Sequence, residues 1–286
     1  MRSYLLLGLL LLAGCHTKPR ELPLFAGATG AKIGWEDLLA ESSRADIIVI
    51  GELHGNRDIH RLQEALVADV TAITPSAALS VEMLERDEQP LVEKWWNREL
   101  NARSFASQTG STNWAGKGTW QTCYQPVLNA ARANGATIVA ANAPREAVRT
   151  ARIDGYDAIE IDEAFYTIPP DLTFPGYRER FFELMQSNSD DEVAEEDMLA
   201  VFRAQTMWDA TMAASIIHAR RNGAQPILHL VGCFHSDFDG GTVQELRRLD
   251  PTARIITISP IATHNKEFLV ENINRATIVV HVSPDE

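Results

Sequence analysis

Two apolar runs far apart in the chain end in the same polar pattern. Residues 47–50 lead into Gly51-Glu52-Leu53-His54, and residues 228–231 lead into Gly232-Cys233-Phe234-His235. A short continuous apolar run closed by Gly predicts a strand that is buried on both faces of a parallel sheet. Ligands bind beyond the carboxyl ends of such strands. We therefore expect His54 and His235 to lie at one edge of the sheet and to line one pocket.

The chain from residue 35 onward alternates strand-like and helix-like segments. Apolar positions at three- and four-residue spacing predict a helix between Asn56 and Pro75, and the pattern over 195–221 predicts a long one. Strands are expected at 46–51, 77–83, 136–141, 226–232 and 254–259. The alternation predicts an α/β domain in which helices cover both faces of a parallel sheet.

Two segments interrupt this alternation. Residues 101–122 are rich in Ser, Thr, Gly and Asn and carry Trp114 and Trp120, so we expect a long loop there. Residues 168–195 are first Pro-rich and then acidic, which predicts a helical insertion. We expect 35–286 to form a single domain that contains this insertion.

The N-terminal residues have the pattern of a secretion signal. Arg2 precedes an apolar stretch that is too short to span a bilayer as a helix. The tetrapeptide ending at Cys15 resembles a bacterial lipobox, which implies a signal peptide over 1–14, a lipid on Cys15 and an anchor and tether over 15–34. Because His16 rather than Asp follows Cys15, the resemblance implies an outer-membrane lipoprotein of a Gram-negative bacterium, facing the periplasm.

Charge and cysteine content narrow the possible partners. The formal net charge is −13 and the basic residues form no run, which argues against nucleic acid as a partner. Apart from Cys15 the chain has only Cys123 and Cys233. The periplasm permits a disulfide between them, but Cys233 at a strand end is more simply a small buried apolar residue.

The residues at the strand ends have the composition of a reactive site. Glu52, His54, Glu82 and His235 offer imidazole and carboxylate groups that suit acid–base catalysis. Three of them, Glu52, His54 and His235, would suit a Zn, Mn or Fe ion. In a purely structural role, Glu52 and His54 would cap the next helix and His235 would be a hydrogen-bonded residue of the core. The supporting positions are His60, Asn142 and Asp209.

Several ordered motifs together resemble one protein family. They are Gly51-Glu52-x-His54, Ser80-Val81-Glu82-Met83-x-Glu85-Arg86-x-x-Gln89, Trp120-x-x-x-Tyr124-x-Pro126, Ala141-Asn142-x-Pro144-Arg145, Ala204-Gln205-x-x-Trp208-Asp209-x-x-Met212-Ala213 and Val231-Gly232-x-Phe234-His235. This set resembles the ChaN-like haem-binding uptake family of the Tiki superfamily and covers roughly residues 35 to 262. The resemblance implies haem binding and a role in iron acquisition. The wider superfamily implies the alternative of a metal-dependent hydrolase, either protease-like or similar to erythromycin esterase.

Haem needs an axial ligand, an apolar cavity and cations for its propionates. Tyrosine is an accepted axial ligand of ferric haem, and Tyr124 and Tyr177 lie in segments that resemble the family; His54 and His235 are the other candidates. Arg145 and Arg178 could meet the propionates. The chain has no Cys-x-x-Cys-His motif, so we expect haem to bind reversibly. A homodimer is an assembly that the resemblance allows.

Overall fold

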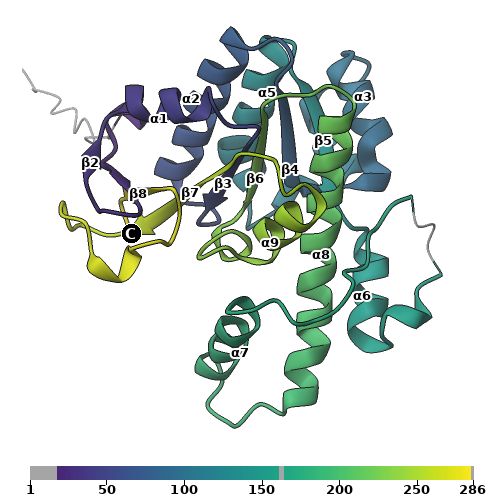
Figure 1. Ribbon diagram of the computed structural model, residues 1–286. Coiled ribbons are helices and arrows are strands. Elements are labelled where there is room, and N and C mark those ends of the chain that lie inside the picture. Colours follow the sequence, from purple (N-terminus) through teal and green to yellow (C-terminus); the bar gives the residue numbers. More distant parts are fainter. Residues whose placement is uncertain (1–17, 161–163, 285–286) are drawn as a thin grey trace, which may run out of the picture.

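The computed structural model describes residues 18–160 and 164–284 and is built around one eight-stranded sheet (Figure 1). The strand order is β2-β1-β8-β7-β3-β6-β4-β5. The strands from β3 to β8 run parallel to their neighbours, whereas β1 is antiparallel to both β2 and β8. The bounds are β1 Leu24–Ala26, β2 Lys32–Ile33, β3 Ile47–Glu52, β4 Ala78–Glu85, β5 Thr137–Asn142, β6 Ile227–Gly232, β7 Ile255–Ala262 and β8 Ile278–Val282.

Helices cover both faces of this sheet. Successive side chains of a strand point to opposite faces, so Ile48 and Ile50 of β3 enter the core beneath α2 and α5, while Ile47 and Val49 pack with α8 and α9. This arrangement confirms the predicted α/β class. The helices are α1 Trp35–Ser42, α2 Arg57–Ile73, α3 Gln89–Trp96, α4 Ala102–Gln108, α5 Gln125–Ala133, α6 Arg145–Ile153, α7 Tyr177–Ser187, α8 Glu195–Arg221 and α9 Gly241–Leu249.

Two sequence-based expectations about the fold were wrong. Residues 24–33 are not a tether, because Leu24 and Phe25 are buried and β1 pairs with β8. Residues 101–122 are not all loop: they contain α4, and a π-helical turn, Trp120–Tyr124, begins before the segment ends. The predicted signal peptide and Cys15 lie outside the described residues.

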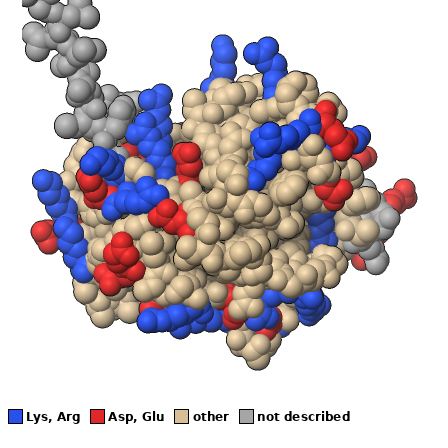
Figure 2. Space-filling view, turned by 90° about the horizontal axis from the view of Figure 1, so that it is seen from above, with Lys and Arg blue, Asp and Glu red and all other residues tan. Residues whose placement is uncertain are grey.

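The segment 168–195 contains α7, which lies below the sheet in Figure 1 beside the N-terminal half of α8. Its aromatic side chains form a separate small core with Phe202 of α8, and they are Phe174, Tyr177 and Phe181. Figure 2 shows acidic and basic side chains interspersed over the upper face of the molecule. Within the described residues, no helix combines the length and apolar character needed to cross a membrane.

Candidate functional site

The two Gly-x-x-His motifs meet at the carboxyl edge of the sheet. β3 and β6 are adjacent parallel strands, with Glu52 opposite Gly232 in the register. A Cβ atom on Gly232 would lie 3.3 Å from Nε2 of His54 and 3.6 Å from Oε2 of Glu82. A glycine here therefore allows the imidazole and the carboxylate to approach the backbone of β6 closely. The expectation that both motifs end at one edge of the sheet is met.

Glu52 is the centre of a buried hydrogen-bond cluster. Its Oε1 accepts hydrogen bonds from Nδ1 of His54 at 2.7 Å and from the hydroxyl of Tyr124 at 2.9 Å. Its Oε2 lies 3.4 Å from Nε2 of Gln63 and 3.8 Å from Nδ1 of His60. Burial alone would raise the pKa of Glu52, but the hydrogen bond from His54 and the nearby charges lower it overall. The carboxylate is therefore held ionised.

His54 is the member of this cluster that reaches the surface. Its side chain is 48% exposed, and its pKa is raised, mainly by the hydrogen bond to Glu52. Its ring meets the edge of Trp114 with centroids 6.4 Å apart. The guanidinium of Arg145 lies 5.8 Å from the Trp114 ring and also pairs with Glu85 at 2.8 Å. An imidazole, an aromatic ring and a cation thus follow one another along one accessible face.

His235 has the same motif but a different environment. It is 6% exposed, and its Nδ1 lies 2.7 Å from Oδ1 of Asp209, a hydrogen bond that joins β6 to α8. Asp209 also accepts hydrogen bonds from Thr242 at 2.6 Å and from Tyr177 at 2.9 Å. Burial lowers the pKa of His235, but the Asp209 carboxylate outweighs burial and raises it to about 9. Asp209 is therefore the partner of His235, a choice that the sequence left open.

Glu82 links the two histidines. Its Oε2 accepts a hydrogen bond from the backbone N–H of Gly232 at 2.6 Å, and its Oε1 lies 3.8 Å from Nε2 of His235. Burial raises its pKa. Asn142 donates to the backbone carbonyl of Glu82 at 2.9 Å, which ties the ends of β4 and β5 together.

The remaining candidates lie deeper or farther away. Tyr124 and Tyr177 are buried, with exposures of 1% and 0%, and each hydroxyl donates to a carboxylate. His60 is buried beside Tyr124 and bonds to Gln63. Arg178 lies on α7, where it pairs with Glu195 rather than with the strand-end cluster.

The described residues contain neither a disulfide nor a three-ligand metal site. Cys123 and Cys233 are both free; Cys123 lies on the π-helical turn, and Cys233 packs against Gly51. Among residues 18–160 and 164–284, no three His, Cys, Asp or Glu side chains are grouped so as to hold a metal ion. Of the predicted ligands Glu52, His54 and His235, the first two bond to each other and the third bonds to Asp209.

Sequence reasoning missed the place of Trp114 in this site. The Ser/Thr/Gly/Asn-rich segment 101–122 marked its surroundings, but no spacing connected this ring to His54. It likewise missed Gln63, which lies one helical turn after His60 and bonds to it at 2.8 Å. That i, i+3 spacing on one helix face was the available signal.

Comparison with known proteins places the chain in a family. The family described as "Haem-binding uptake, Tiki superfamily, ChaN" matches residues 38–246, which is well over half of the chain. The chain belongs to this family. The ChaN family match spans β3 to α9 and so includes every strand-end residue described above. No curated protein matches the chain.

Solved structures show the same fold at low identity. ChaN of Campylobacter jejuni, described with cofacial haem binding, has a TM-score of 0.71 and 16% identity, covering 92% of this chain and 97% of that one. The type III effector HopBA1 has a TM-score of 0.50 and 13% identity, covering 94% of this chain and 100% of that one. An erythromycin esterase in its open conformation has a TM-score of 0.48 and 11% identity, covering 92% and 83%. At these identities the first two matches show the fold alone.

Proposed function

We propose that this ChaN-family protein binds haem reversibly on the face formed by His54, Trp114 and Arg145, and that it serves haem or iron acquisition. The observation that carries the proposal is the order of these three groups along one accessible face. They match the needs of haem: a ligand for iron, an aromatic surface for the macrocycle and a cation for a propionate. Family membership and the haem binding described for the Campylobacter protein support the same ligand.

His54 fits the role of axial ligand better than either tyrosine. Histidines that ligate iron or zinc commonly donate their other ring N–H to a carboxylate, as Nδ1 of His54 does to Glu52. Its Nε2 faces Gly232 of β6, which carries no side chain to cover it, and the imidazole as a whole is half-exposed. The hydroxyls of Tyr124 and Tyr177 donate hydrogen bonds to buried carboxylates. Burial is the largest cause that raises the pKa of both phenols, and the negative charge of the carboxylates is the next. A phenolate ligand is therefore disfavoured in this structure, contrary to our sequence-based preference.

The two arginines considered as partners of the haem propionates also differ in their positions. Arg145 is exposed over Trp114 and keeps N–H groups beyond the one that bonds to Glu85. Arg178 belongs to α7 and packs over Phe182. We therefore assign a propionate to Arg145 and none to Arg178.

The cellular setting is part of the proposal. A lipid on Cys15 would hold the protein at the outer membrane, facing the periplasm. In a homodimer, a second copy of the protein would pack against the accessible face that carries His54. Size-exclusion chromatography with light scattering, with and without hemin, measures this assembly.

Hemin titration followed by the visible spectrum tests the haem site. We expect a saturable shift for the wild type and binding at least about tenfold weaker for His54→Ala, because the axial bond is lost. His264→Ala removes another exposed histidine and should bind like the wild type. Trp114→Ala and Arg145→Gln should weaken binding less.

The tyrosine variants decide the identity of the ligand. Tyr124→Phe and Tyr177→Phe should each keep the spectrum of the wild-type complex. A high-spin charge-transfer band that disappears in one of them would instead identify a phenolate ligand. If hemin gives no saturable shift and the purified protein carries stoichiometric Zn or Mn, the metal-dependent hydrolase that uses Glu52, His54, Glu82 and His235 replaces the haem proposal.

A further inference from the structure

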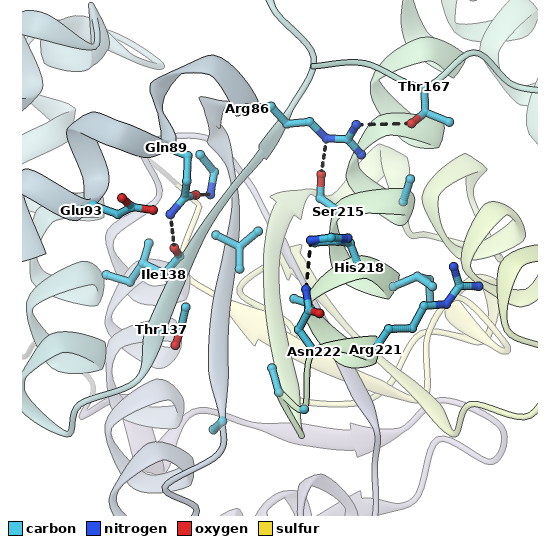
Figure 3. A pocket seen from close by; sticks show the side chains of 18 of the residues that line it. Arg86, Gln89, Glu93, Thr137, Ile138, Thr167, Ser215, His218, Arg221 and Asn222 are labelled. Atoms are coloured by element: carbon cyan, nitrogen blue, oxygen red, sulfur yellow. Dashed lines mark hydrogen bonds between the residues drawn. The ribbon is translucent and has the colours of Figure 1, made fainter. Parts of the chain in front are cut away.

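A cavity lies along the free edge of the sheet, away from His54. It has a volume of about 890 Å³ and runs between β5 and α3 on one side and the second half of α8 on the other (Figure 3). Small-molecule sites commonly have volumes of 300 to 1,000 Å³. Its lining includes Arg86, Thr137, Ile138, Ser215, Ile217 and Asn222. The cavity has the size of a ligand site.

Arg86 supplies an unusual cation at one end of this cavity. Its Nε donates to Ser215 at 2.7 Å, its NH2 group to the carbonyl of Thr211 at 2.8 Å, and its NH1 group to Thr167 at 3.4 Å. All three acceptors are neutral. In the described part of the chain, no carboxylate forms an ion pair with Arg86. Burial lowers its pKa to about 10.

A partly buried cation that has no ion-pair partner within residues 18–160 and 164–284 is costly, so its surroundings require an explanation. Among the other partly buried arginines, Arg220 pairs with Asp46 and Asp250 and Arg275 pairs with Asp237. Arg180 and Arg203 donate instead to backbone carbonyls, as Arg86 does to that of Thr211. A guanidinium has five N–H donors, and the three neutral acceptors use three of them. Two donors are left, which is the number that a carboxylate accepts in a paired contact.

We propose that this cavity is a second ligand site, which takes a small organic acid with a single carboxylate on Arg86. One guanidinium balances one carboxylate, whereas a phosphate monoester carries about −1.5 to −2 at pH 7. Glu93 also lines the cavity and disfavours a second negative group on the ligand. Val139 and Leu249 are only partly buried in the lining and provide apolar contacts for the body of the ligand, and Thr137 and Asn222 offer hydrogen bonds.

This site is separate from the proposed haem face. Glu85 pairs with Arg145 beside Trp114, whereas the next residue, Arg86, extends to α8. The two sites can therefore be loaded independently, and their ligands should not compete.

NMR titration with hexanoate tests the site. We expect saturable binding, with shifts at Ile138, Thr167 and Ser215, and dissociation constants at least about tenfold larger for hexanamide and hexyl phosphate. Arg86→Gln should weaken hexanoate binding at least about tenfold. Arg149→Gln, which removes an exposed arginine on α6, should bind like the wild type.

If Arg86→Gln does not fold, the Arg86→Lys variant tests the same proposal. It keeps the charge but loses the paired donors, so we expect intermediate affinity and hexanoate-dependent thermal stabilisation smaller than that of the wild type. No saturable binding to the wild type, equal binding of hexanamide, or unchanged affinity in both Arg86 variants would overturn the proposal. Competition between hexanoate and hemin on the wild type would also overturn it, because the cavity would then be part of the haem site.

Discussion

At the scale of the residue, one short motif produces two different histidines. His54 and His235 both come three residues after a strand-end glycine, yet His54 is half-exposed and His235 is buried. The difference comes from their partners. Glu52 lies on the same strand end as His54, whereas His235 bonds to Asp209 of α8, beside Tyr177 of α7. We infer that the first histidine is placed to meet a ligand and the second to hold elements together.

The pH dependence of stability tests the role of His235. Its pKa is about 9 in the folded protein and about 6.5 when unfolded, so its stabilising contribution is complete below pH 6.5 and is lost as the pH rises through 9. The contribution is at most about 3 kcal/mol. Asp209→Asn should destabilise the protein by about 3 kcal/mol at pH 7 and should lose most of the stability change between pH 7 and 10.

Urea unfolding at several pH values measures this effect. The exposed control Asp154→Asn should keep the wild-type pH profile. An Asp209→Asn profile parallel to that of the wild type between pH 7 and 10 would show that the ion pair does not set the titration of His235.

Sequence alone could predict the carboxyl-edge cluster but not its roles. Glu52, His54, Glu82 and His235 were identified because each follows or ends an apolar run, and a parallel sheet brings such ends together. The burial of the Tyr124 and Tyr177 hydroxyls against carboxylates depends on tertiary packing, which no local pattern encodes. The contact between Trp114 and His54 also depends on tertiary packing, so the sequence could not predict it.

At the scale of the element, long regular segments could be predicted and short ones could not. α8 has the expected bounds, Glu195–Arg221, and β6 ends at the expected Gly232. β3 ends at Glu52, one residue later than expected. β1 and β2 were missed because segments of two or three residues are too short to show an alternation of apolar and polar positions. Their pairing also depends on β8 at the far end of the chain. Edge strands of this kind are fixed by their partners more than by their own sequence.

Side chains protect the opposite edge of the sheet at β5. The amide of Gln89 donates to the carbonyl of Ile138 at 3.1 Å and accepts from the N–H of Ala140 at 2.8 Å, as a neighbouring strand would. Trp96 donates to the carbonyl of Ala136 at 3.1 Å. Exposed strand edges promote pairing between molecules, and these bonds occupy that edge.

We predict that Gln89→Ala destabilises the protein by about 1 to 3 kcal/mol, because two backbone groups of β5 lose their partners. Hydrogen exchange of the Ala140 amide should become faster by a corresponding factor. Gln108→Ala, on the exposed end of α4, should change stability by less than about 0.5 kcal/mol. Unchanged protection at Ala140 would mean that the Gln89 bond does not contribute in solution.

At the scale of the whole molecule, the proposed attachment to a membrane would depend on one cysteine. Cys15→Ser should give a protein that no longer incorporates labelled palmitate and that accumulates as a soluble or uncleaved form, because the thiol is the acylation site. A Cys123→Ser variant keeps the lipobox-like segment and should be labelled like the wild type. Palmitate labelling that persists in Cys15→Ser would exclude the lipoprotein proposal.

The order of the strands also sets what an anchored molecule presents to its surroundings. β1 and β2 form one border of the sheet and begin shortly after Cys15, while β5 forms the other border, seven strand spacings away. At about 4.8 Å per spacing, the two borders are about 34 Å apart. In the proposed lipoprotein the acylated end would be near the lipid, and the Arg86 cavity would lie at the border of the sheet opposite β1 and β2. A diffusing organic acid could then reach it without contacting the membrane surface.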